Sequence, residues 1–154
     1  MKIGVVSDTH GLLRPEVPPL FAGVERILHL GDVGDARILK TLGKVAPVTA
    51  VRGNIDREGA CGRLPETEVL LIENGYLYLL HDLATLHLDP AAAKFAAVLY
   101  GHSHKATIWR QKGVLYFNPG SCGPRRFNLK VTIGYLHVGT DGAFTPEIID
   151  VPCD

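Results

Sequence analysis

Short apolar segments that alternate with helix-length segments constrain the fold of this chain more than any other feature. Residues 2–7, 26–30 and 46–51 are short β-rich runs. Residues 15–21 and 35–42 lie between them, the first with a proline near its start and the second with apolar residues at helical spacing. Strands that alternate with helices form βαβ units with buried parallel strands. The sequence therefore predicts a largely parallel sheet in this part of the chain.

The rest of the chain is predicted to form strands joined by turns, with one further helix. Residues 69–73 and 76–80 flank Asn74-Gly75, which supplies the positive φ angles of a type I′ turn and predicts a hairpin. Residues 89–95 are predicted to form a short helix, because Asp89-Pro90 has the form of an N-cap followed by proline. Further strands are predicted at residues 98–100 and 114–117, and a closing hairpin at residues 131–138 and 144–151.

These elements fit one domain over residues 1–154, because the sequence has no internal repeat, low-complexity tract or linker. Hydrophobic residues make up 46% of the chain and charged residues 21%, which is typical of a globular protein. So many strands in 154 residues predict an α/β fold. We expect two mixed β-sheets packed face to face as a sandwich and flanked by helices.

Charge and cysteine content exclude several classes of protein. Lys plus Arg and Asp plus Glu both number 16, so the net charge of zero argues against a dedicated nucleic-acid or membrane-surface binder. No apolar run approaches the ~20 residues of a membrane span, and the apolar start is too short for a signal peptide. Cys61, Cys122 and Cys153 form no CxxC pair and are expected to be free thiols. We therefore expect a cytoplasmic protein.

Polar residues of the kinds that bind metals follow the predicted strands directly. Ligands in α/β sheets collect beyond the carboxyl ends of the strands, so these side chains are expected to converge. Glycine precedes three of them and allows the backbone to turn sharply there. The converging residues are Asp8, His10, Asp32, Asn54, His81, His102 and His104.

Two carboxylates, four imidazoles and one amide are too many donors for one four-coordinate zinc ion. They suit two divalent ions with one bridging carboxylate, which would clamp the attacking and leaving oxygens of an in-line displacement. Two such ions with two carboxylates leave the site net positive, which favours an anionic substrate such as a phosphate. The donor set allows Mn, Fe, Co, Ni or Zn and does not choose among them.

Other residues of these types have simpler structural interpretations. His29 lies inside an apolar run and is expected to be a structural histidine, and His137 alternates within a predicted strand. His87 is expected at the surface, and Asp35 as a helix N-cap. Trp109 belongs either to the core or to a subunit contact. The Gly-His-Ser-His segment taken alone would also fit a polar turn.

Five short motifs resemble the calcineurin-like metallophosphoesterase superfamily. A sixth, together with the short length of the chain and the strand before the fifth motif, resembles its small bacterial and archaeal phosphodiesterase branch. The resemblance covers roughly residues 1–126. It implies a four-layer α/β/β/α arrangement, two divalent metal ions with manganese favoured, a small phosphoester substrate, and a homodimer or homotetramer. The motifs are Asp8-Thr9-His10, Gly31-Asp32-Val33-Gly34-Asp35, Gly53-Asn54-Ile55-Asp56, His81, Gly101-His102-Ser103-His104 and Asn118-Pro119-Gly120-Ser121.

The resemblance also implies roles for single residues. It implies attack of a metal-bridging hydroxide on phosphorus without a covalent enzyme intermediate, and support of the site by Asn118 and Ser121. The predicted catalytic residues are Asn54, Asp56 and His102. The implied ligands are Asp8, His10, Asp32 and His104 for one ion, and Asp32, Asn54, His81 and His102 for the other.

The sequence departs from the family pattern at two positions. Ile55 stands where many members have a histidine that can protonate the leaving group, which favours diesters with good leaving groups over monoesters. Asp56 is the nearest replacement, and it has the alternative role of orienting a ligand. After His81, Asp82 replaces a glycine and is expected either to hold a neighbouring imidazole or to form a turn.

Two functions from different classes remain open at this point. The first is a metal-dependent phosphodiesterase. The second is an inactive scaffold, as in the small phosphoesterase-fold subunit of the retromer coat, which such proteins reach by losing a ligand histidine. All ligand positions are intact here, which favours the enzyme. Arg125 and Arg126 are expected either to hold substrate phosphate or to form a solvated loop.

Overall fold

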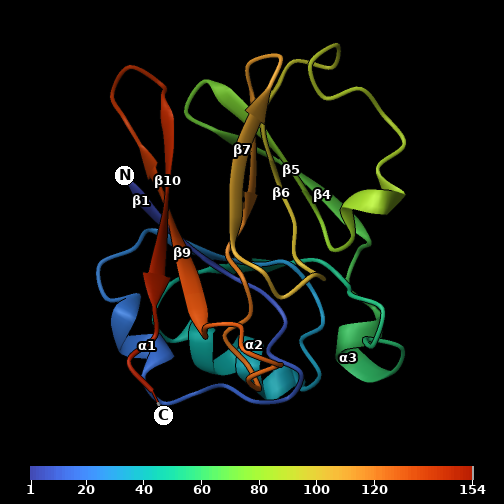
Figure 1. Ribbon diagram of the computed structural model, residues 1–154, viewed down its shortest axis with the longest axis vertical. Coiled ribbons are helices and arrows are strands. Elements are labelled where there is room, and N and C mark those ends of the chain that lie inside the picture. The colour runs from blue at the N-terminus through green and yellow to red at the C-terminus, as the bar shows by residue number, and fades with distance from the viewer. Residues whose placement is uncertain (154) are drawn as a thin grey trace.

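The computed structural model describes residues 1–153, which form two five-stranded sheets packed against each other (Figure 1). The first sheet has the order β10-β9-β1-β2-β3, with β1 parallel to β2 and β2 parallel to β3. The strands of this sheet are β1 (Lys2–Val6), β2 (Arg26–His29), β3 (Val48–Ala50), β9 (Thr132–Val138) and β10 (Phe144–Asp150).

The second sheet has the order β4-β5-β6-β8-β7, in which β5, β6 and β8 are parallel to one another and the two edge strands are antiparallel. Both sheets are therefore mixed, as predicted. The strands of this sheet are β4 (Thr67–Ile72), β5 (Gly75–Leu80), β6 (Phe95–Leu99), β7 (Thr107–Gln111) and β8 (Val114–Asn118).

The main core lies between the two sheets. Alternate residues of each strand point inward, so Ile3 and Val5 of β1 meet Leu77 and Leu79 of β5 in one cluster with Phe117 of β8. Each of these side chains is fully buried. Burial of one such side chain contributes about 1.5–3 kcal/mol, so this layer holds the two sheets, and the loops at their ends, in one rigid arrangement.

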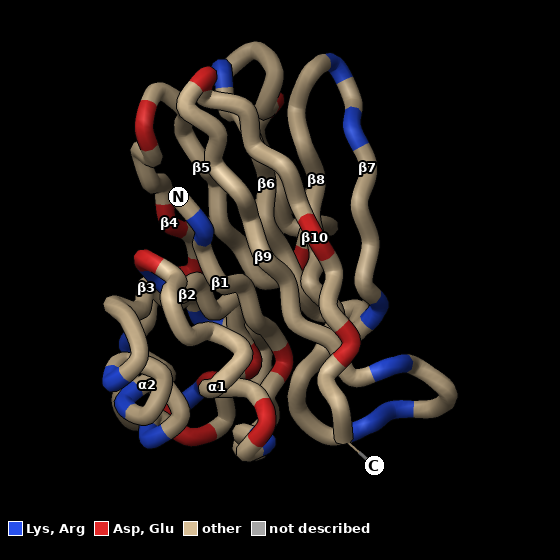
Figure 2. The backbone as a smooth tube through the Cα atoms, turned by 90° about the vertical axis from the view of Figure 1, so that its left-hand side faces the viewer, with Lys and Arg blue, Asp and Glu red and all other residues tan. Residues whose placement is uncertain are grey.

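Two helices cover the outer face of the first sheet, and they are α1 (Val17–Leu20) and α2 (Ala36–Gly43). Val17 and Phe21 pack with Ile38 and Leu42 of α2 in a second apolar cluster on this face. Asp35 caps α2 by accepting a hydrogen bond from the Arg37 backbone N–H at 2.9 Å, as predicted. Figure 2 shows both helices at the same end of the sheets.

The outer face of the second sheet is covered by residues 81–94, whose only helical element is the 3-10 turn η1 (Leu83–Thr85). The expected sandwich is confirmed, but its fourth layer is a loop rather than an α-helix in the part of the chain described. The helix predicted over residues 89–95 is wrong. Asp89 accepts hydrogen bonds from the next two free N–H groups, as an N-cap would, but Lys94 takes a φ of 63° that ends the turn before β6 begins.

The hairpin of β4 and β5 forms as predicted, with its turn shifted by one residue. Ile72 pairs with Gly75, so the central residues are Glu73 and Asn74, and the positive φ falls on Glu73 at 53°. Gly75 has a packing role instead, because a Cβ there would lie 2.4 Å from Cε2 of Phe144. The sequence pattern placed Gly75 in the turn, whereas the structure shows that a glycine is needed there for the contact with β10.

A short helix, α3 (Gly59–Gly62), follows β3.

Trp109 lies half-buried on the outer face of the second sheet, where its ring stacks on Tyr116 with 4.0 Å between centroids. Its Nε1–H donates a hydrogen bond to the Tyr100 hydroxyl at 3.0 Å. Within residues 1–153, no helix is long and apolar enough to cross a membrane.

Candidate metal centre

The loops that follow the parallel strands of both sheets meet at one edge of the sandwich, and they bring the seven predicted residues together. Asp8 and His10 follow β1, Asp32 follows β2, and Asn54 follows β3. The other three come from the second sheet: His81 follows β5, and His102 and His104 follow β6.

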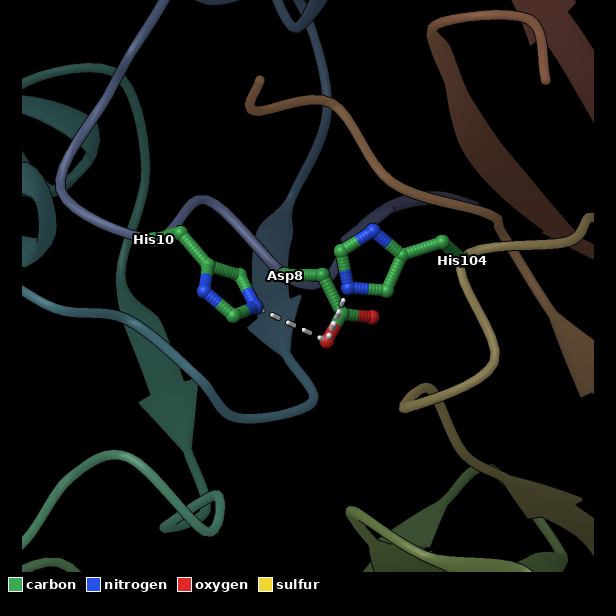
Figure 3. A group of neighbouring side chains, drawn as sticks. All are labelled: Asp8, His10 and His104. Carbon is green, nitrogen blue, oxygen red and sulfur yellow. Dashed lines mark ion pairs between the residues drawn. The ribbon is translucent and has the colours of Figure 1, made fainter. Parts of the chain in front are cut away.

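Asp8, His10 and His104 form one group (Figure 3). The two imidazole rings face the Asp8 carboxylate from opposite sides, with each Nε2 directed at Oδ1. The distances from this oxygen are 3.8 Å to His10 and 3.5 Å to His104. The three donors come from loops 96 positions apart in sequence at most, so only the packing of the two sheets brings them together.

Asp32, His81 and His102 form the second group, and Asn54 joins it. The Nε2 atom of His81 lies 3.2 Å from Asp32 Oδ2, 3.1 Å from Asn54 Oδ1 and 3.3 Å from His102 Nδ1. The Nδ1–H of His81 donates to the Leu30 carbonyl at 2.7 Å, which leaves the Nε2 lone pair directed into the group. Four donor atoms therefore lie close together, three of them within 3.3 Å of His81 Nε2.

Asp32 joins the two groups. Its Oδ2 atom lies 3.2 Å from His10 Nε2 and 3.2 Å from His81 Nε2, so one carboxylate oxygen faces both sets of donors. Ligands at about 2.1 Å from a divalent ion lie roughly 3.0–3.4 Å from one another, and most distances in this cluster fall in or near that range. The arrangement matches that of a carboxylate shared by two ions.

Three buried atoms of the first group lack hydrogen-bond partners among the described residues. They are Asp8 Oδ1, His10 Nε2 and His104 Nδ1, and the first two are directed into the cluster. A buried polar atom without a partner costs about 1–3 kcal/mol, and native proteins contain few of them. A divalent cation would satisfy the first two atoms, so the residues present fit a metal ion.

The backbone around the cluster is strained. Nine non-glycine residues in the described chain have a positive φ, and five of them are Asp8, His10, Asp32, His102 and His104. The left-handed conformation costs roughly 1–2 kcal/mol for such residues and persists only where the surrounding structure imposes it. Its concentration at five of seven converging side chains marks this edge of the sandwich as a functional site.

Glycine is required where the loop after β3 passes Asp32. A Cβ on Gly53 would lie 2.1 Å from both the backbone N and Oδ1 of Asp32. The absence of a side chain therefore lets the two loops touch, which brings Asn54 up to the second group. This fits the expected role of the glycines that precede these ligands.

The surroundings of Asp32 favour its ionised carboxylate over the protonated form. Burial works to raise the pKa of Asp32, but donation from Nε2 of a protonated His81 and from the Ile55 N–H outweighs it, and the pKa falls to about 2. Burial likewise opposes the charge on His81, but Asp32 and Asp8 raise its pKa overall. The Asp32 carboxylate is therefore ionised near neutral pH and can bind a cation.

Side chains behind the cluster hold its loops in place. The Asn118 side-chain amide donates to the Gly101 carbonyl and to Ser103 Oγ, each at 3.0 Å, and the Ser121 hydroxyl donates to the Asp8 carbonyl at 2.9 Å. Asp82 forms the expected turn, in which its Oδ1 accepts from the Ala84 N–H at 3.0 Å. Its Oδ2 faces His102 Nε2 across 3.8 Å, which is longer than a hydrogen bond.

Asp56 is placed differently from the expectation that it serves as a proton donor. The side chain is buried, and its two oxygens accept hydrogen bonds from the N–H groups of Val33, Gly34 and Gly53 at 2.9–3.1 Å. The carboxylate is therefore committed to joining the loops after β2 and β3. Asp56 therefore positions these loops and does not serve as a proton donor. The side chain of Ile55 is exposed at the surface.

The structural interpretations of the remaining histidines are confirmed. His29 is fully buried, accepts the Gly31 N–H at Nδ1 and lies 3.0 Å from the Thr9 hydroxyl, and burial lowers its pKa to about 4. His137 pairs with Glu147 at 2.8 Å, and His87 is exposed. None of the three lies in the groups described above.

The segment between β8 and β9 contains Arg125, Arg126 and Lys130 but no acidic residue (Figure 2). Both arginines are exposed, and Arg125 makes only a long 3.5 Å contact with the Leu129 carbonyl. Burial lowers the pKa of His104, and the positive charge of Arg126 acts in the same direction as a smaller influence.

Sequence reasoning missed a cavity of about 230 Å³ beside Asn54 and His81. Its further lining residues come from the segment after β3, the segment just before β4 and the loop that contains η1. No spacing in the sequence relates these segments, so no local signal identified them. The further lining residues are Arg52, Gly53, Glu66, Asp82 and Thr85.

Comparison with known proteins identifies related sequences and folds. The family model of the calcineurin-like phosphoesterase superfamily domain matches residues 1–141. A probable metallophosphoesterase of Methanocaldococcus jannaschii is 35% identical over 143 residues, covering 84% of this chain and 72% of that protein. The phosphodiesterase YfcE of Escherichia coli K12 is 32% identical over 149 residues, covering 79% of each.

Solved structures share the fold. A structure described as a novel archaeal phosphodiesterase has a TM-score of 0.80 at 24% identity and covers 97% of this chain and 100% of its own. Vps29 of Chaetomium thermophilum has a TM-score of 0.76 at 15% identity, covering 98% and 95%. At these identities the likeness shows the fold alone. In this chain that fold brings together the potential metal ligands described above.

Proposed function

Because this chain belongs to the calcineurin-like phosphoesterase superfamily, we propose that it is a dinuclear metal-dependent phosphodiesterase. The observation that carries the proposal is the position of Asp32. One of its carboxylate oxygens, Oδ2, lies 3.2 Å from a histidine ring nitrogen of each ligand group. Relatives named as phosphodiesterases, 32% and 28% identical to this chain, support the substrate class.

Seven residues would hold the two ions. We assign Asp8, His10 and His104 to one ion and Asn54, His81 and His102 to the other, with Asp32 shared. Two divalent ions, for which manganese is favoured, would lower the pKa of water bound at the site and withdraw charge from the phosphoryl oxygens. These assignments rest on the donor atoms, their spacing and the two unpartnered buried atoms that are directed into the cluster.

The protein's own side chains orient the substrate at the open side of the cluster. His102 has 46% of its side chain exposed, with Nδ1 turned toward Asn54 and Nε2 toward Asp82. We therefore propose that His102 and Asn54 contact the phosphoryl group. Arg126, in the exposed segment between β8 and β9, would offset the charge of the bound phosphate.

Diesters with good leaving groups fit this site better than monoesters. Ile55 has no proton to give to a leaving oxygen, and Asp56 is fully occupied by three backbone N–H groups. A poor leaving group needs such a proton, whereas an aryl oxygen departs without one. We therefore infer that leaving-group quality controls the rate.

An inactive scaffold is the second candidate, and the likeness in fold to Vps29 keeps it open. The intact set of donors favours the enzyme. A cytoplasmic location and a homodimer or homotetramer also stay predictions, the first supported by three free cysteines among the described residues.

Hydrolysis of bis(p-nitrophenyl) phosphate with added Mn²⁺ or Ni²⁺ tests the proposal. We expect turnover by the wild type and a loss of at least about 100-fold in His10→Ala and Asp32→Ala. His137→Ala is the matched control, because that histidine lies outside both groups and pairs with Glu147. Turnover by the wild type that is no faster than that of His10→Ala or Asp32→Ala supports the scaffold instead.

A further inference from the structure

The cavity lies beside the second ligand group and shares two residues with it. Asn54 and His81 line the cavity and also belong to that group. Figure 1 shows η1 and α3 on the same side of the molecule, and the lining residues come from the segments next to them. An ester arm of a phosphate held by the cluster would therefore enter this space.

The lining of the cavity contains hydrogen-bonding side chains, and its one arginine is paired with a carboxylate. The Arg52 guanidinium donates to the Gly62 carbonyl at 3.0 Å and to Glu66 Oε1 at 2.6 Å. Its charge is therefore matched by Glu66, and Asp82 adds a second carboxylate to the wall. The Thr85 hydroxyl donates to the Asp82 carbonyl, which leaves its oxygen free to accept.

We propose that this cavity binds a neutral, hydroxyl-bearing ester arm of the substrate, such as a glycerol or a sugar. The proposal rests on the proposed phosphodiesterase function and deepens it. Hydroxyl groups both donate and accept, so they pair with the carboxylates, with the remaining N–H groups of Arg52 and with Thr85. A second phosphate or a carboxylate in the arm meets Glu66 and Asp82 and is repelled.

The volume agrees with an arm of this size. A cavity of 230 Å³ corresponds to roughly eight water molecules at their share of liquid volume. That space holds a glycerol or a single sugar ring. The cavity therefore selects the group attached directly to the phosphate.

Four p-nitrophenyl phosphodiesters that differ only in the second arm test this proposal. The arms are glyceryl, ethyl, choline and 2-carboxyethyl, and p-nitrophenol is the leaving group in each. We expect kcat/KM for the glyceryl ester to exceed that for the ethyl ester by about tenfold or more, because only the glyceryl arm can form hydrogen bonds with the charged groups of the lining. The carboxyethyl ester should be the poorest substrate.

The variant Glu66→Gln separates charge from shape. Glu66 has 76% of its side chain exposed, so the change leaves the fold intact. The variant removes the negative charge that opposes an anionic arm, and we expect the glyceryl-to-carboxyethyl ratio of kcat/KM to fall about tenfold. Glu25→Gln is the matched control, since Glu25 is exposed just before β2, at the opposite end of that strand from Asp32.

Binding provides a readout that does not depend on turnover. Isothermal titration should give a Kd for glyceryl phosphate at least about fivefold below that for ethyl phosphate in the wild type. Equal affinity, an ethyl ester hydrolysed as well as the glyceryl ester, or a choline ester preferred to both overturns the proposal. If bis(p-nitrophenyl) phosphate is still hydrolysed in that case, the proposed phosphodiesterase function stands and only the assignment of the cavity fails.

Discussion

Acidification should destabilise the metal-free protein through His29. This histidine is fully buried, and its Nδ1 accepts the Gly31 N–H at 3.2 Å, so protonation at Nδ1 breaks that hydrogen bond and buries a charge. The pKa is lowered from 6.5 to about 4 by burial. Because the folded state resists protonation, the stabilisation is complete above pH 6.5 and is lost as the pH falls toward 4.

The magnitude follows from the two pKa values. The limiting loss is about 3.4 kcal/mol, and at pH 5.0 the loss from this group is about 2 kcal/mol relative to pH 7.5. Urea unfolding in the presence of a chelator measures it, followed by the fluorescence of Trp109, the single tryptophan. His81 and His10, whose pKa values are raised, contribute in the opposite direction but are common to all variants compared.

The variant His29→Asn isolates the contribution. Asparagine keeps an acceptor near the Gly31 N–H but does not titrate, so the variant should be less stable at pH 7.5 and should lose about 2 kcal/mol less than the wild type on going to pH 5.0. Equal losses in the two proteins would refute the reasoning, because they would mean that His29 takes up no proton on unfolding.

Three further predictions concern the site. Gly53→Ala should abolish phosphodiester turnover while far-ultraviolet circular dichroism stays native, because the new Cβ would lie 2.1 Å from Asp32; wild-type turnover would contradict the close approach. Asp82→Asn should weaken binding of one of the two ions by about 10–100-fold in metal titrations, because the carboxylate faces His102 Nε2; an unchanged affinity would leave Asp82 as a turn residue only. Ile55→His, at an exposed position, should raise the hydrolysis of alkyl esters by about tenfold or more with little change for aryl esters, and equal effects on both would argue against a missing proton donor.

The site was predictable because its residues obey a local rule. Asp8, Asp32 and Asn54 each follow a short apolar strand, and the carboxyl ends of parallel strands meet at one edge. The same rule predicts that His81 and His102 converge, because they follow parallel strands of the second sheet. The sequence therefore sufficed to predict which side chains lie together, although the strain at these residues became visible only in the backbone angles.

The failures arose where distant contacts decide the local structure. Gly75 belongs to the packing against Phe144, 69 positions away, so the turn signal was shifted by one residue. Asp56 looked available for proton transfer because no sequence rule reveals the three N–H groups that saturate it. Arg52 and Thr85 meet at the cavity only because β3 and the loop around η1 come together in the fold.

The number of metal ions bound per chain tests the central claim most directly. The purified protein would be stripped of metal, reconstituted with Mn²⁺, separated from free ions and analysed by inductively coupled plasma mass spectrometry together with Asp32→Ala and His137→Ala. The account predicts two ions per chain in the wild type and in His137→Ala, and at most one in Asp32→Ala, which lacks the shared carboxylate. A wild type that holds one ion or none, or an Asp32→Ala variant that keeps two, would contradict it.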